Sequence, residues 1–236
     1  MKSVNPFIDR RHKMVREQIA GRGVHDPKVL DAMEHVAREA FVPEHLRDLA
    51  YTDQPLPIGE DQTISQPYIV AAMTEALGLK GGENVLEIGT GSGYAAAVLA
   101  HIAREVHSVE RIAELAKRAR KVLRRLGYRT VDVIEGDGSL GWPGAAPYDA
   151  IVVTAEGPRI PPSLRAQLKP GGRLVMPISE GPLEQVLVRV THSAEHGDRM
   201  EKICPVRFVP LIGQEGWSPA ERSHAGTPST APSRSG

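Results

Sequence analysis

Short apolar runs alternate with amphipathic helical segments through the middle of the chain. The runs are apolar along nearly their whole length, which is typical of strands in a parallel sheet that helices cover on both faces. We expect strands at residues 85–89, 105–110, 131–135, 148–154 and 173–178, with helices at 94–103, 112–126 and 163–168. The pattern therefore predicts an α/β fold: a doubly wound, mostly parallel, Rossmann-like sheet.

The segments that flank this alternation have different patterns. Residues 9–49 are helical, and Asp26-Pro27 is a good N-cap and first turn for a helix at 28–36. The stretch 51–67 contains Pro55, Pro57 and Gly59, so we expect a long ordered loop there. Long loops within compact domains are often functional.

The carboxyl-terminal part contains a closing strand pair and then a change of composition. Residues 185–190 and 202–209 are expected to pair antiparallel around a turn at 192–199. Residues 214–236 are dominated by Ser, Pro, Ala, Gly and Thr and predict a disordered tail. We expect one domain over 1–213, with N-terminal helices and a substrate loop at 9–66 and a Rossmann-like core at 67–213.

Composition narrows the class of protein. The 236 residues carry 29 Lys+Arg and 29 Asp+Glu, so no overall basic field favours nucleic acid or an anionic membrane. A single cysteine, Cys204, excludes an internal disulfide and suits a reducing compartment. No apolar run reaches the roughly 18 residues of a membrane span, and the N-terminus has no signal-peptide pattern. We expect a cytoplasmic monomer.

The strongest chemical signal is a glycine-rich turn between the first strand of the alternation and the helix after it. Its sequence, Glu87-Ile-Gly89-Thr90-Gly91-Ser92-Gly93, lets the backbone approach a ligand closely at a helix N-terminus. Glu110 ends the next strand, where its carboxylate could accept both ribose hydroxyls of an adenosine cofactor. The G-x-G-x-G spacing and the acidic Glu87 favour S-adenosyl-L-methionine over NAD, because that ligand carries an ammonium and no pyrophosphate.

A second candidate lies at the end of the third strand. Asp137, between Gly136 and Gly138, could reach an adenine amino group in the crevice at the carboxyl edge of the sheet. Asp-Gly is also an ordinary turn, so this signal has weight only beside the glycine motif.

Several segments together resemble the protein-L-isoaspartate O-methyltransferase family over about residues 14–213. The resemblance rests most on Gln62-Thr63-Ile64-Ser65-Gln-Pro67, because the glycine motif alone indicates only a class I methyltransferase. The other matching segments are Phe41-Val-Pro43, Val85–Tyr94, Gly136–Gly138, Pro147–Ile151, Gln167–Val175 and Phe208–Leu211.

The resemblance implies methyl transfer from S-adenosylmethionine to the free α-carboxylate of L-isoaspartyl residues in damaged proteins and peptides, which initiates their repair. It implies Ser65 as the functional serine and Gln62, Thr63, Ile64 and Ser65 as site lining that also binds the cofactor. It implies further cofactor contacts from Glu87 to Gly93, Glu110, Asp137 and Gly138. Two positions depart from the family pattern: Asp61, where glycine is usual, and Glu156, where alanine is usual. Either could alter the substrate mouth.

The chemistry assigns Ser65 a positioning role. An α-carboxylate with a pKa of roughly 3.3–3.7 is already an anion at neutral pH, so the reaction needs alignment more than a general base. A hydroxyl donor just before a helix N-terminus suits such an anion. Ser65 is also a candidate N-cap for a helix at 66–77.

Other functions remain open at this point. A methyltransferase for a small-molecule carboxylate, a non-catalytic S-adenosylmethionine-binding module and an NAD dehydrogenase each share part of the signal. No metal site is predicted, since His192 and His196 lie in a turn where their spacing does not place them on one face. Cys204 is expected to be a small packed residue, without a nucleophilic role.

Overall fold

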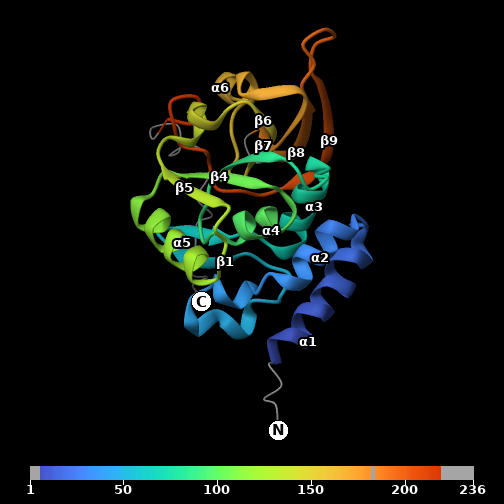
Figure 1. Ribbon diagram of the computed structural model, residues 1–236, viewed down its shortest axis with the longest axis vertical. Coiled ribbons are helices and arrows are strands. Elements are labelled where there is room, and N and C mark those ends of the chain that lie inside the picture. Colours follow the sequence, from blue (N-terminus) through green and yellow to red (C-terminus); the bar gives the residue numbers. More distant parts are fainter. Residues whose placement is uncertain (1–5, 182–183, 219–236) are drawn as a thin grey trace, which may run out of the picture.

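The computed structural model describes residues 6–181 and 184–218, and within them a seven-stranded sheet forms the centre of the molecule (Figure 1). Its strand order is β5-β4-β3-β6-β7-β8-β9, with parallel pairing from β5 to β7 and antiparallel pairing of β7, β8 and β9. The strands are β3 (Asn84–Ile88), β4 (Glu105–Glu110), β5 (Val131–Glu135), β6 (Tyr148–Val153), β7 (Leu168–Gly181), β8 (Glu184–Thr191) and β9 (Arg199–Val206). The predicted fold class is confirmed.

Both faces of the sheet are buried, because successive residues of each strand point to opposite sides. On one side Val85, Val106 and Val152 join a core built with α3 (Pro67–Leu77), α4 (Tyr94–Ile102) and α5 (Ala113–Arg125). On the other side Leu86 and Ile151 pack with α6 (Pro162–Ala166).

The N-terminal helices pack on the first of these sides. They are α1 (Pro6–Lys13), a π-helical turn (Met14–Ile19) and α2 (Pro27–His35), and α2 contacts both α3 and α4 (Figure 1). Asp26 caps α2 as predicted, since its carboxylate accepts from the Lys28 N–H at 2.9 Å. Short 3₁₀ turns at Ala20–Arg22, Arg38–Ala40, Glu44–Leu49, Gly138–Leu140 and Pro143–Ala145 complete the helical segments.

The prediction of a long ordered loop at 51–67 is wrong for residues 56–64. Residues there form a hairpin of β1 (Leu56–Gly59) and β2 (Gln62–Ile64). The two turn residues, Glu60 and Asp61, have φ of 54° and 55°, the left-handed backbone that a tight hairpin turn of this kind requires. Neither residue type signals such a turn in sequence, which is why the hairpin was missed.

Two further boundaries differ from prediction. β7 begins at Leu168, five residues before the strand expected at 173–178. β9 spans Arg199–Val206, three residues earlier than the expected 202–209. The start of β7 pairs with β6, through Tyr148 and Leu168, and β9 takes its register from β8.

The predicted disordered tail is wrong for its first five residues, 214–218. The Gln214 N–H donates to Asp137 at 2.8 Å, and the Trp217 N–H donates to the Leu211 carbonyl at 2.7 Å. Glu215 accepts from both the N–H and the hydroxyl of Ser163 at 2.8 Å. The prediction rested on the average composition of residues 214–236, which does not reflect the hydrogen-bonding side chains at its start. Residues 219–236 lie outside the described residues.

Among the described residues, no helix is long and apolar enough to cross a bilayer.

Gly93 offers a test of how the glycine motif packs. Its φ is 87°, and an added Cβ would lie 3.2 Å from Leu123 of α5. We expect Gly93→Ala to lower the free energy of unfolding by roughly 2–5 kcal/mol, from left-handed strain plus overpacking. Urea unfolding would measure it.

Gly127→Ala is the matched control, because Gly127 has φ of 86° and nothing within 4 Å of an added Cβ. The decrease in the free energy of unfolding of Gly127→Ala should therefore come from left-handed strain alone. Equal losses in the two variants would contradict a packing role for Gly93.

Candidate active site

A cleft opens at the carboxyl ends of β3, β4 and β6. The order β4-β3-β6 makes β3 the point where the chain changes winding direction, which is where ligands bind in open α/β sheets. The lining comes from the hairpin, the glycine loop, the end of β4 and the segment after β9: Asp61–Ser65, Val70, Ile88–Ser92, Tyr94, Ala95, Val109–Ile112, Gly138, Thr154, Ala155 and Val209–Ile212.

The glycine loop forms the floor of this cleft. Gly89 has φ of 94°, and a Cβ there would collide with the Thr154 hydroxyl. That hydroxyl donates to the Gly89 carbonyl at 2.8 Å, while the Gly89 N–H donates to the Val109 carbonyl at 2.8 Å. The loop is therefore fixed to both neighbouring strands, and glycine is required at 89.

Glu110 connects the loop to the end of β4. One carboxylate oxygen accepts from the Gly91 N–H and the other from the Ile112 N–H, each at 2.9 Å. Glu110 is only 6% exposed, yet it lines the cleft. A carboxylate oxygen has more than one acceptor site, so Glu110 can still accept from a ligand hydroxyl.

Glu87 lies behind the floor, outside the residues that line the cleft. It is fully buried and accepts from the Ser108 hydroxyl, which lies 2.5 Å from the Thr90 hydroxyl in turn. Its second oxygen has no partner among the described residues. Burial raises the pKa of Glu87 to about 8, with a smaller contribution from the charge of Glu110 and an opposing one from Ser108.

Of the two candidates after the third strand of the alternation, one lines the cleft and one does not. Gly138 lines the cleft, whereas the Asp137 carboxylate accepts from Ser139 at 2.7 Å (hydroxyl) and 2.9 Å (N–H), and from the Gln214 N–H. Gly93 also lies outside the lining, packed against α5. Ten of the predicted cofactor residues thus gather at the cleft: Gln62, Thr63, Ile64, Ser65, Gly89, Thr90, Gly91, Ser92, Glu110 and Gly138.

The hairpin carries Ser65 to the opposite wall. Ser65 is half-buried, lines the cleft, and its hydroxyl makes no hydrogen bond within the described part of the chain. The N-cap prediction for Ser65 was wrong: α3 starts at Pro67 with Gln66 at the cap position. Proline restricts the residue before it to extended backbone, which moves the helix start one residue onward.

Contacts on two sides of the hairpin hold this wall in place. The Gln66 amide donates to Asp53 at 2.7 Å, and Arg22 pairs with the same carboxylate at 2.5 Å while lying over the Tyr68 ring. On the other side Arg118 of α5 donates to the Ile58 carbonyl at 3.1 Å. The backbone on both sides of Ser65 is therefore anchored.

Sequence reasoning missed part of the lining. Thr154 and Tyr94 face the cleft, as does Val209–Ile212. In the sequence, these residues could have been found only because they lie in or next to the segments that match the family pattern. Apolar residues and a single threonine form no chemical motif by themselves.

The two departures from the family pattern have different surroundings. Asp61 lines the cleft from the hairpin turn. Glu156 is 5% exposed, does not line the cleft, and accepts from the Trp217 indole N–H at 3.0 Å. Burial raises the pKa of Glu156, and that indole N–H offsets part of the rise.

The fold and cleft define a class I methyltransferase: a switch-point cleft floored by a G-x-G-x-G loop with an acidic residue at the end of the next strand. Comparison with known proteins gives the family. A model of the protein-L-isoaspartate(D-aspartate) O-methyltransferase family matches residues 9–216, and the chain belongs to this family. The resemblance stated from sequence is confirmed.

Relatives with family names match over nearly their whole length. Protein-L-isoaspartate O-methyltransferase 1 of Rhodopseudomonas palustris (strain HaA2) is 60% identical over 225 residues, covering 95% of this chain and 92% of that protein. Protein-L-isoaspartate O-methyltransferase 2 of Pelobacter propionicus is 60% identical over 208 residues, covering 88% and 92%.

Solved structures have the same fold. A protein-L-isoaspartate O-methyltransferase superposes with a TM-score of 0.79 at 31% identity, covering 87% of this chain and 67% of that one. A Plasmodium falciparum structure assigned to the same family, solved with S-adenosyl-L-homocysteine, gives 0.71 at 24% identity and covers 86% and 98%.

The buried Glu87 predicts how stability depends on pH. Its pKa is about 8 in the folded chain against 4.5 for the ordinary carboxyl, so the folded state binds the proton more tightly. Its contribution is present below pH 4.5 and is lost as pH rises toward 8. We expect Glu87→Gln to flatten this fall in the free energy of unfolding, measured by urea titrations across the range.

The exposed Glu184 on β8 supplies the control, as Glu184→Gln should leave the slope unchanged. A slope that persists in Glu87→Gln would show that Glu87 is ionised in the folded protein.

Proposed function

We propose that the chain transfers a methyl group from S-adenosyl-L-methionine to the free α-carboxylate of L-isoaspartyl residues in damaged proteins and peptides, the step that initiates their repair. One observation carries this proposal. The unbonded hydroxyl of Ser65 lies in the same cleft as the glycine loop and Glu110, so an anion donor and a cofactor floor share one space.

The cleft suits an adenosine-type methyl donor. Ile88, Val109 and Leu211 supply apolar walls for a flat base, and Glu110 supplies an acceptor for ribose hydroxyls. Glu87 has a buried oxygen without a partner just behind the loop, and a cationic ligand group on the other side would favour its ionised form. The bound donor supplies an electrophilic methyl group on a sulfonium.

The cofactor contacts of the floor therefore fall to Gly89–Ser92 and Glu110 directly, and to Glu87 and Gly93 through the packing of the loop. Asp137 is held by Ser139 and Gln214, so we assign it the indirect role of fixing Gly138 at the cleft.

Ser65 positions the substrate. The cleft lining contains no histidine or lysine among the described residues, and a carboxylate nucleophile needs no base. The Ser65 hydroxyl donates to one carboxylate oxygen and leaves the other free to attack in line. Gln62 and Thr63 line the same wall, where backbone groups of β2 can hold an extended peptide of any sequence.

We further propose that the protein acts as a monomer in the cytoplasm, without nucleic acid or membrane partners. The balanced charge of the chain supports the absence of nucleic-acid and membrane partners, and its single cysteine suits a reducing compartment.

Ser65→Ala tests the positioning role. Loss of a hydrogen bond to a charged group should lower turnover on an isoaspartyl peptide by about 10–150-fold. Because Ser65 caps no helix, the melting temperature and S-adenosylhomocysteine affinity should stay unchanged. Ser193→Ala, in the turn between β8 and β9, is the control with full activity. Unchanged turnover in Ser65→Ala would contradict the assignment.

Glu110→Gln tests the cofactor floor. An amide cannot accept on both sides, so either the Gly91 or the Ile112 N–H loses its partner and the ribose acceptor weakens. We expect S-adenosylhomocysteine to bind roughly tenfold more weakly or worse, by calorimetry. Glu114→Gln, on the exposed face of α5, should bind normally. Equal affinity in both variants would exclude Glu110 as a cofactor ligand.

The reaction itself is tested with matched peptides that differ only in L-isoaspartate against L-aspartate. Labelled methyl ester on the isoaspartyl peptide alone is expected. Label on a small carboxylic acid in preference to the peptide would favour a small-molecule methyltransferase. Cofactor binding with no transfer to either would favour a binding module.

A further inference from the structure

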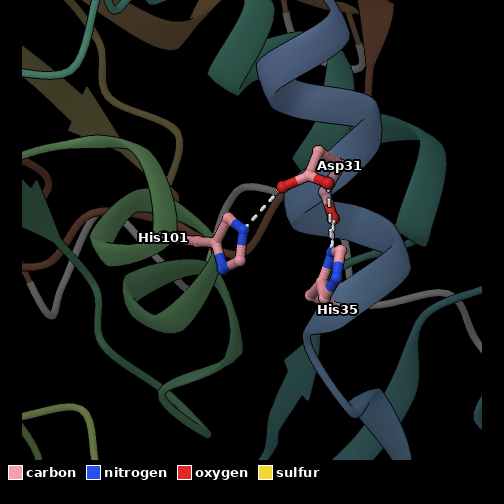
Figure 2. A group of neighbouring side chains, drawn as sticks. All are labelled: Asp31, His35 and His101. Carbon is pink, nitrogen blue, oxygen red and sulfur yellow. Dashed lines mark hydrogen bonds and ion pairs between the residues drawn. The ribbon is translucent and has the colours of Figure 1, made fainter.

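Three side chains with metal-binding atoms meet on the surface where α2 contacts α4, away from the cleft. Asp31 and His35 lie one turn apart on α2, and His101 comes from the last turn of α4 (Figure 2). One donor atom from each residue lies within 4.8 Å of the others. None of the three lines the cleft, so the proposed methyl transfer does not use them.

Both imidazoles turn a nitrogen toward the same carboxylate, as Figure 2 shows. Nε2 of His101 lies 2.8 Å from Oδ2 of Asp31, and Nδ1 of His35 lies 3.3 Å from Oδ1. The two rings are stacked, with centroids 5.2 Å apart and an angle of 20° between their planes. The donor atoms therefore converge from two helices.

We propose that Asp31, His35 and His101 form a surface site for a borderline transition-metal ion, with Zn²⁺ as the ion that fits best. Two imidazole nitrogens and one carboxylate oxygen are a common open zinc ligand set, in which water fills the remaining position. Tetrahedral zinc with bonds near 2.0–2.1 Å places its ligand atoms about 3.3 Å apart. The nitrogen–oxygen separations of 2.8 and 3.3 Å lie close to this value, and the three donor atoms lie within 4.8 Å of one another.

The exposure of the site favours both entry and adjustment. The side chains of Asp31 and His35 are 55% and 61% exposed, and that of His101 is 30% exposed. Nδ1 of His35 also lies 2.8 Å from the Asp31 carbonyl oxygen, and metal binding at Nδ1 would place the proton of the neutral ring on Nε2. Bound metal would fasten the N-terminal helices to α4, whose first residue, Tyr94, lines the cleft.

The test is calorimetric titration of the full chain with Zn²⁺, with Mg²⁺ as a hard-ion control. We expect saturable binding of one Zn²⁺ with a micromolar or tighter dissociation constant. His35→Ala, His101→Ala and Asp31→Asn should each weaken it by roughly 10–100-fold. A hundredfold excess of Zn²⁺ over the dissociation constant should raise the melting temperature of the wild type by about 5–10 °C.

The chain contains a matched control. His192 and Asp198 form an imidazole–carboxylate pair at the same 2.8 Å, in the turn between β8 and β9, without a second imidazole in the described contacts. His192→Ala should bind Zn²⁺ like the wild type. Absence of saturable Zn²⁺ binding, or equal weakening in His192→Ala and His101→Ala, would overturn the proposal. The exposed positions allow each variant to fold, which unchanged isoaspartyl methylation without metal would verify.

Discussion

The backbone of the glycine loop determines where everything else at the cleft can lie. Three neighbouring strands fix it: β4 through the carbonyl of Val109 and the carboxylate of Glu110, β6 through Thr154, and β3 from which it emerges. Because Gly89 adopts a φ of 94° with no room for a Cβ, no other residue could make these contacts at once. Displacement of the loop would move the start of α4, and with it Tyr94 and the cleft wall.

The second wall is held by weaker interactions. Arg118 and Glu60 are 45% and 46% exposed in their ion pair, so water screens it and it contributes little to stability. Arg22, Asp53 and Gln66 form the stronger anchor on the other side of the hairpin. A rigid floor and a less firmly held hairpin suit an enzyme whose cofactor is constant and whose peptide substrates vary in sequence.

Sequence predicted the floor better than the walls. Strand and glycine positions from 84 to 154 follow from apolar periodicity and turn chemistry, which are local properties. The β1–β2 hairpin could not be predicted in this way, because Glu60 and Asp61 adopt left-handed backbone without a glycine or asparagine at either position to signal it. The meeting of His35 with His101 depends on how α2 docks against α4, a tertiary contact that no spacing along the chain reveals.

The departures from the family pattern become separable once their partners are known. Glu156 and Trp217 form a hydrogen-bonded pair. A buried carboxylate needs a donor, and the indole N–H of Trp217 supplies one. Glu156 also exchanges backbone hydrogen bonds with Val209 and Leu211, so it holds the segment that contains Trp217 and does not itself line the cleft. Asp61 lies in the lining itself, beside Gln62 and across from the glycine loop. Of the two, only Asp61 lies where a bound substrate could contact it.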